Sequence, residues 1–125
     1  MKRIDQTAFE TETTRGNCMQ AAVASILELP LESVPNFIEH NSPWGVLNKF
    51  LRGFNLRIFG IIDDYWPHTY YLATGLSPRN IQHMVVYHGR DLAHDPHPSR
   101  GGIVVEDKYM ILPSDMKEQV RRFQQ

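Results

Sequence analysis

Residues 82–102 read QHMVVYHGRDLAHDPHPSRGG, and this stretch predicts the antiparallel hairpin on which the fold depends. A β-branched and aromatic run opens at His83, and a turn through Gly89 and Arg90 reverses the chain. A shorter strand then ends at Asp95. Because strands joined by a tight turn pair antiparallel, we expect the side chains of His83 and Asp95 to come close together.

The sequence on both sides of this hairpin also has the pattern of short strands separated by turns. From Asn55 onward, short β-branched or aromatic runs alternate with Gly, Pro, Asp and Asn, which is typical of strands joined by turns. The expected strands are LRIFGII (56–62), TYYLATG (69–75), HMVVYH (83–88), GIVVED (102–107) and YMILP (109–113). A last helix is expected from Ser114.

The N-terminal part of the chain predicts helices instead. Residues 18–29 carry apolar side chains at helical spacing, with Asn17 as the expected N-cap and Pro30 as the stop. A second short helix is expected from Leu31, and a third over SPWGVLNKFLRGF (42–54). Helices followed by strands predict an α+β fold, in which helices cover one face of a small antiparallel sheet.

Length and composition predict one globular domain over residues 1–125. The chain is 42% hydrophobic and 22% charged, and its single cysteine excludes an internal disulfide. With 13 Lys plus Arg against 14 Asp plus Glu, the net charge of -1 gives no electrostatic footprint for nucleic acid or an anionic membrane. No secretory signal and no apolar run long enough to span a bilayer is found, so a cytoplasmic protein is expected.

The single cysteine, Cys18, stands at the expected start of the first helix, in the stretch RGNCMQAAVASILEL (15–29). The positive end of a helix, together with a nearby imidazolium, favours the thiolate form of a cysteine. Free amides in the first turn can also hold a developing oxyanion. The alternative interpretation is structural, because a cysteine on an alanine-rich helix is commonly a small buried apolar residue.

His83 and Asp95 supply the other two groups that nucleophilic catalysis needs. In this interpretation the Asp95 carboxylate holds one ring nitrogen of His83 while the other nitrogen faces a thiol. The alternative for Asp95 is a turn, because Asp followed by Pro commonly initiates one.

The order of these residues resembles the papain-like cysteine peptidase superfamily. A Cys opening an early helix, a His opening a later strand and an Asp in "DP" are most similar to the bacteriocin-leader peptidases that precede some ABC exporters. Phage and bacterial proteins of unassigned function with "GNC", "LPL…VP" and "HDPHPS" are similar over nearly the whole chain.

The resemblance implies a cysteine-dependent hydrolase or acyltransferase, with Cys18 as nucleophile, His83 as base and Asp95 as the group that orients the base. It also implies a Gln that donates to the oxyanion, for which Gln6 is the candidate and Gln20 the fallback. No cofactor or metal is implied, and the substrate is a peptide or protein. Gly75 and Ser77 are expected to border the cleft, and HPSRGG (97–102) to form a flexible lip.

Three other interpretations remain open. The histidines and aspartates of 83–97 are metal-ligand types, although strand alternation places His94 and Asp95 on opposite faces. The aromatic segment DDYWPHTYY (63–71) is suited either to a ligand or to packing on the sheet edge. Finally, the fold can serve as an inactive protein-binding module, such as a phage-encoded inhibitor of a host protein. The groove is expected to be shallow, so a second copy of the chain in a homodimer, or a host protein partner, could supply its missing wall.

Overall fold

The centre of the protein is a five-stranded antiparallel sheet. The computed structural model describes residues 1–11 and 15–114. Strand β2 (Tyr70–Leu76) pairs with β3 (Gln82–His88), and β3 pairs with β4 (Asp91–His94) through the turn at Gly89 and Arg90. The predicted hairpin is therefore confirmed, and Asp95 follows its second strand directly.

Strand β5 (Val104–Pro113) lies between β2 and the edge strand β1 (Leu56–Gly60). The strand order is therefore β1-β5-β2-β3-β4. The two strands expected over 102–107 and 109–113 are one strand, so the prediction of a break near Lys108 is wrong. The Lys108 side chain is buried and its ammonium group donates to the carbonyls of Asp63 and Tyr65, so a lysine is accommodated within a strand.

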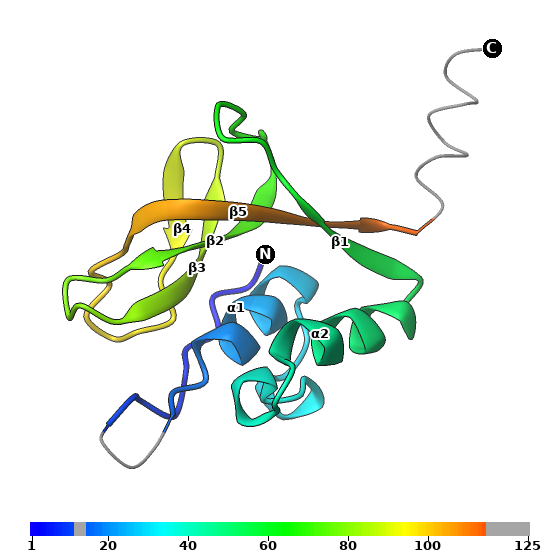
Figure 1. Ribbon diagram of the computed structural model, residues 1–125, viewed down its shortest axis with the longest axis horizontal. Coiled ribbons are helices and arrows are strands. Elements are labelled where there is room, and N and C mark those ends of the chain that lie inside the picture. The colour runs from blue at the N-terminus through cyan, green and yellow to red at the C-terminus, as the bar shows by residue number, and fades with distance from the viewer. Residues whose placement is uncertain (12–14, 115–125) are drawn as a thin grey trace.

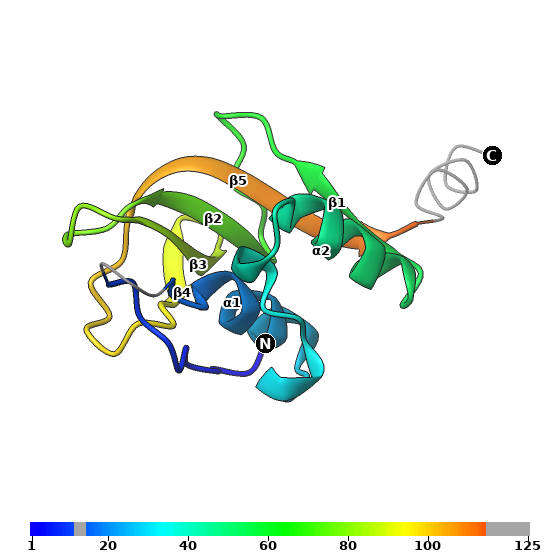
Figure 2. The same cartoon turned by 60° about the horizontal axis from the view of Figure 1, so that its bottom comes forward.

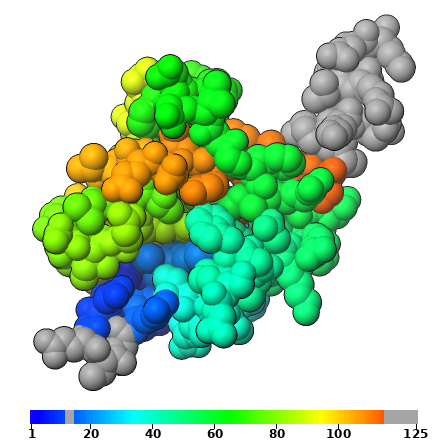
Figure 3. Space-filling model, in the orientation of Figure 1, coloured from blue at the N-terminus to red at the C-terminus, as the bar shows by residue number. Residues whose placement is uncertain are grey.

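Two α-helices pack on one face of this sheet (Figures 1 and 2). Helix α1 (Cys18–Leu27) packs mainly against β3, and α2 (Pro43–Arg52) packs against β1. The shared core includes Val23, Phe37, Leu47, Leu72 and Val86, all fully buried. Figure 3 shows the two layers in contact, with the N-terminal part in blue to cyan below the strands in green to orange.

The second predicted helix is replaced by two 3₁₀ turns, Leu31–Ser33 and Phe37–Glu39. Pro35 lies between them, and a proline in this position prevents one continuous helix. The first helix ends at Leu27, earlier than predicted, with Glu28 in a left-handed conformation. Asn17 and Ser42 hold the N-cap positions of α1 and α2, yet neither side chain makes a capping hydrogen bond. The N-cap position expected for Asn17 is confirmed.

The arrangement confirms the α+β class: helices come first and cover one face of an antiparallel sheet (Figure 1). The helix expected from Ser114 lies outside the described residues, apart from Ser114 itself. Within residues 1–11 and 15–114, neither α-helix has the length and apolar character that crossing a bilayer requires.

Candidate active site

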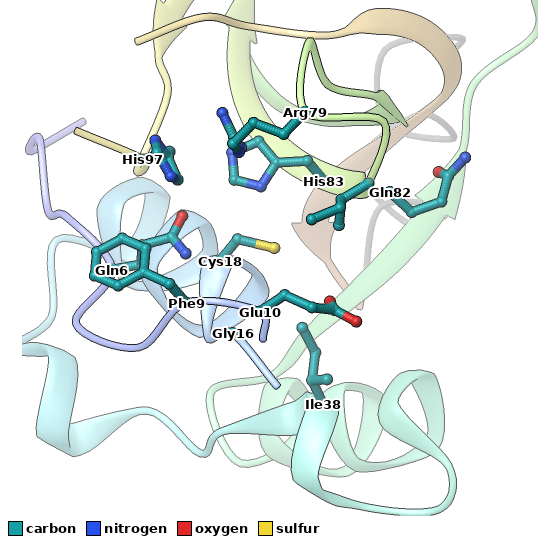
Figure 4. A pocket seen from close by; sticks show the side chains of 11 residues that line it. Gln6, Phe9, Glu10, Gly16, Cys18, Ile38, Arg79, Gln82, His83 and His97 are labelled. Atoms are coloured by element: carbon teal, nitrogen blue, oxygen red, sulfur yellow. The ribbon is translucent and has the colours of Figure 1, made fainter. Parts of the chain in front are cut away.

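Cys18 is the first residue of α1, and its side chain is 8% exposed at the wall of a cavity of about 90 Å³. The first intrahelical bond runs from the N–H of Ala21 to the carbonyl of Asn17, so the amides before Ala21 have no partner within the helix. The thiol therefore lies at the positive end of the helix, beside donor groups. Figure 4 shows the sulfur below the ring of His83, with the Gln6 amide on the other side of the Cys18 side chain.

His83 lies near the start of β3 and lines the same cavity. It is 6% exposed. Its Nε2 lies 2.6 Å from Oδ1 of Asp95, and Figure 4 shows the other ring nitrogen, Nδ1, on the side of the ring that faces the Cys18 sulfur. Burial lowers the pKa of His83, but the hydrogen bonds to Asp95 and Cys18 and the charges of both raise it to about 9. The ring is therefore held as an imidazolium at neutral pH.

Asp95 stands directly after β4 and is 1% exposed. Besides His83, its carboxylate accepts the backbone N–H of His97 at 2.9 Å and that of Gly102 at 2.8 Å. Burial raises its pKa, but these three hydrogen bonds and the charge of His83 bring it down to about 2. Both interpretations of the Asp-Pro pair apply, because Asp95 forms a turn with His97 and also holds the His83 ring.

Gln6 reaches the cavity from the N-terminal arm, in spite of its long separation from Cys18 in the sequence. Its backbone N–H donates to the carbonyl of Pro96 at 3.1 Å, and its Nε2 donates to the carbonyl of Ala8 at 2.9 Å. The side chain is 7% exposed. An amide nitrogen has two hydrogens, so the second one is available to a ligand in the cavity.

The stretch GNC explains how the arm comes so close to the thiol. A Cβ on Gly16 would lie 3.2 Å from the carbonyl oxygen of Ala8 and 3.4 Å from Nε2 of Gln6, so a side chain there would push the arm back by a few tenths of an ångström. Oδ1 of Asn17 accepts the backbone N–H groups of Thr7 and Ala8 at 2.9 and 2.8 Å. Asn17 therefore joins the arm to the start of α1.

Gln20, the fallback donor, is used elsewhere. Its amide nitrogen donates to the carbonyls of Leu31 and Val34 at 3.0 and 2.8 Å, and its oxygen accepts from Nδ2 of Asn17. All of these bonds are structural, and Gln20 does not line the cavity. The fallback assignment is not supported.

The expected cleft borders differ from those observed. Neither Gly75 nor Ser77 lines the cavity; the wall contains Arg79 and Ile81 from the turn that follows them. A Cβ on Gly75 would lie 1.8 Å from the carbonyl oxygen of Val104, so this glycine is explained by the close approach of β5. The segment after Asp95 is tied down by hydrogen bonds among His97, Ser99 and Arg100, instead of forming a free lip.

The histidines of the alternative metal site point to different places. His88 packs edge to face against Tyr70, and Nε2 of His94 lies 2.8 Å from the carbonyl of Ile4. In the part of the chain that the structure describes, no three His, Cys, Asp or Glu residues are grouped to hold a metal ion. In the aromatic segment 63–71, Trp66 and Tyr71 pack in a second apolar cluster on the sheet, with Nζ of Lys108 4.1 Å from the centre of the Trp66 ring, whereas Tyr65 and Tyr70 are exposed.

Several residues of the cavity wall carry no sequence signal for the site, namely Phe9, Glu10, Ile38 and Arg79. His97 is a metal-ligand type in the sequence, and its place two residues after Asp95 is the signal for its proximity to His83. The two rings stand nearly perpendicular, with centres 6.2 Å apart.

No family model, no curated protein and no solved structure matches the chain. A thiol at a helix start, an imidazolium held by a buried carboxylate and a side-chain amide all meet at one cavity. Such a set can form and stabilise a covalent bond between sulfur and a carbonyl carbon.

Proposed function

We propose that the protein is a cysteine-dependent hydrolase or acyltransferase of the papain-like type, acting on a peptide or isopeptide bond. The observation that carries the proposal is that Cys18 and His83 line the same cavity and that Nε2 of His83 lies 2.6 Å from the buried carboxylate of Asp95. A nucleophile, a base and a group that orients the base are the parts that this chemistry requires.

The reaction follows from the roles of these groups. The Cys18 sulfur attacks the carbonyl carbon as a thiolate, its proton being the one already held by the imidazolium of His83, and His83 gives that proton to the leaving nitrogen as the C–N bond breaks. The acyl group is then bonded to sulfur as a thioester. Water or another acceptor attacks that carbon, His83 takes its proton, and the C–S bond breaks to restore Cys18.

The oxyanion formed in each half of the reaction needs donors. The backbone N–H of Cys18 lies in the first turn of α1, where no intrahelical acceptor is available. The second hydrogen on Nε2 of Gln6 supplies another donor in the same cavity. Removing one such donor from an enzyme typically costs a factor of about a hundred or more in rate.

Acylation by p-nitrophenyl acetate tests the proposal without knowledge of the natural substrate. The wild-type protein should release p-nitrophenolate in a stoichiometric burst and carry the acetyl group on Cys18 by mass spectrometry. Cys18→Ser and His83→Ala should show no burst. A proteome-derived peptide library, searched for new termini that Cys18→Ser does not produce, then tests whether amide bonds are cleaved.

The alternative function is an inactive papain-like scaffold that binds a protein. A Cys18 that reacts no faster than a free cysteine, with unchanged rates in His83→Ala and no burst, would overturn the enzyme and favour this scaffold. The comparison with Cys18→Ser controls for acetylation of surface lysines by the reagent.

A further inference from the structure

The proposed triad leaves His97 without a role, although its ring lines the cavity. Its Nδ1 accepts the backbone N–H of Ser99 at 3.0 Å and lies 2.8 Å from the Ser99 hydroxyl. A backbone N–H can only donate, so Nδ1 carries no hydrogen in this geometry. The neutral ring therefore carries its hydrogen on Nε2, for which no hydrogen bond is found among the described residues.

The surroundings of His97 keep this ring neutral. Burial lowers its pKa, as do the positive charges of Arg79, His83 and Arg100, whereas Asp95 alone raises it. The cationic histidine of the site is His83, and His97 stands beside it as a neutral hydrogen-bond donor.

The Gln6 side chain presents a hydrogen-bond acceptor, which complements the donor on His97. Its nitrogen is held by the carbonyl of Ala8, which fixes the orientation of the amide, while its Oε1 is buried and has no hydrogen-bond partner. The residue is 7% exposed. A buried acceptor without a donor is uncommon and costs free energy, so its persistence points to a ligand group.

The positions of the two groups are fixed relative to each other. The backbone N–H of Gln6 donates to the carbonyl of Pro96, the residue before His97. The His97 ring also packs edge to face against Phe9, with ring centres 5.3 Å apart. Figure 4 shows His97 beside His83, on the side of the cavity where the Gln6 amide lies.

We propose that His97 and Gln6 bind an amide group of the substrate, with Nε2 of His97 donating to its carbonyl oxygen and Oε1 of Gln6 accepting its N–H. This amide is a neighbour of the carbonyl that Cys18 attacks, so the inference rests on the proposed function and makes it more specific. It selects substrates with a peptide group beside the reacting bond over simple esters or thioesters. Because both protein groups are held before the substrate arrives, little ordering accompanies binding.

The test uses two alkylating probes that differ only at one linkage, which is an amide in one and an ester in the other. N-acetyl-alanyl-alanyl chloromethyl ketone carries the amide, and its analogue has an ester oxygen in place of the N–H between the two alanyl units. Wild-type protein should be inactivated about tenfold faster by the amide probe, because the ester leaves Oε1 of Gln6 without a donor. This comparison needs no substitution and so does not depend on the folding of a variant.

Substitution of His97 tests the other half of the contact. Methyl methanethiosulfonate, which has no amide, reports the reactivity of the thiol alone. In His97→Phe the ratio of the amide-probe rate to the methanethiosulfonate rate should fall about tenfold. His88→Phe is the matched control, since His88 packs on Tyr70 outside the cavity, and its ratio should equal that of the wild type.

The outcomes separate this inference from the proposed function. Equal rates with the amide and ester probes, or an unchanged ratio in His97→Phe, on a Cys18 that still depends on His83, overturn the amide site alone. A Cys18 that reacts with methyl methanethiosulfonate no faster than a free cysteine, in wild type and His83→Ala alike, overturns the proposed function itself.

Discussion

Nε2 of His83 and Oδ1 of Asp95 lie 2.6 Å apart in an environment that is closed to solvent, and their bond makes stability depend on pH at both ends. The pKa of Asp95 falls from 3.8 to about 2, so its contribution is present above pH 3.8 and is lost as the pH falls through 2. The pKa of His83 rises from 6.5 to about 9, so its contribution is present below pH 6.5 and is lost as the pH rises through 9.

The first prediction is therefore a loss of stability on the alkaline side. The free energy of unfolding should fall by about 2 to 3 kcal/mol between pH 6.5 and 9.5. Urea titrations followed by tryptophan fluorescence measure it. In Asp95→Asn this slope should flatten, whereas the exposed His88→Gln should keep it. A wild-type slope equal to that of Asp95→Asn would mean that the pair is not charged in the folded protein.

The second prediction concerns the charge beside the thiol. Iodoacetate is an anion and iodoacetamide is neutral, so the ratio of their alkylation rates at Cys18 reports the positive charge of His83. The ratio should fall as the pH rises through about 9, where His83 loses its proton. Arg79 remains charged at the cavity wall, so part of the preference for iodoacetate persists. In His83→Gln the ratio should show no step near pH 9; a step there would assign it to another group.

The fold could be predicted from the sequence because its signals are local. Gly89 and Arg90 mark the hairpin turn, and the apolar spacing after Cys18 marks α1. Strand β5 was divided in two because Lys108 interrupts its apolar residues. Only the fold brings the carbonyls of Asp63 and Tyr65 to that ammonium group.

The part of the site that lies within one hairpin could be predicted from the sequence. The hairpin brings His83 and Asp95 to the same end of β3 and β4, but the register shift between Val86 and Tyr87 decides which face Asp95 occupies, and the turn alone does not predict that shift. The contacts of Gln6 and Asn17 depend on tertiary structure, which residue spacing does not report. Asn17 was expected to cap its own helix, yet its oxygen bonds the arm at Thr7 and Ala8. The orientation of His97 depends on Ser99 in the same way.

The third prediction follows from the close approach of β2 and β5 at Gly75. A Cβ there would lie 1.8 Å from the carbonyl oxygen of Val104, so Gly75→Ala forces the two strands apart. We expect a loss of about 3 kcal/mol in the free energy of unfolding. Gly60→Ala is the control, because a Cβ on Gly60 meets nothing within 4 Å, and its effect should stay within about 0.5 kcal/mol. Similar denaturation midpoints for the two variants would contradict the observed approach.

The fourth prediction separates the role of Asn17 in stability from its role at the site. Asn17→Ala removes the acceptor for the backbone N–H groups of Thr7 and Ala8, next to Gln6. Ser25→Ala removes the acceptor for the N–H of Ile4, at 3.1 Å, farther along the same arm. Each change removes side-chain hydrogen bonds between the arm and α1 while the backbone bonds remain, so each should lower the free energy of unfolding by about 1 to 2 kcal/mol.

Only the first of these changes frees the segment that carries the oxyanion donor. The rate of the p-nitrophenyl acetate burst should therefore fall about a hundredfold in Asn17→Ala and stay near the wild-type value in Ser25→Ala. Gln6→Ala should match Asn17→Ala in burst rate, and the double variant should be no slower than Gln6→Ala, because both changes remove the same donor. Burst rates that follow the loss of stability in all four variants would instead show that Asn17 acts only by holding the fold together.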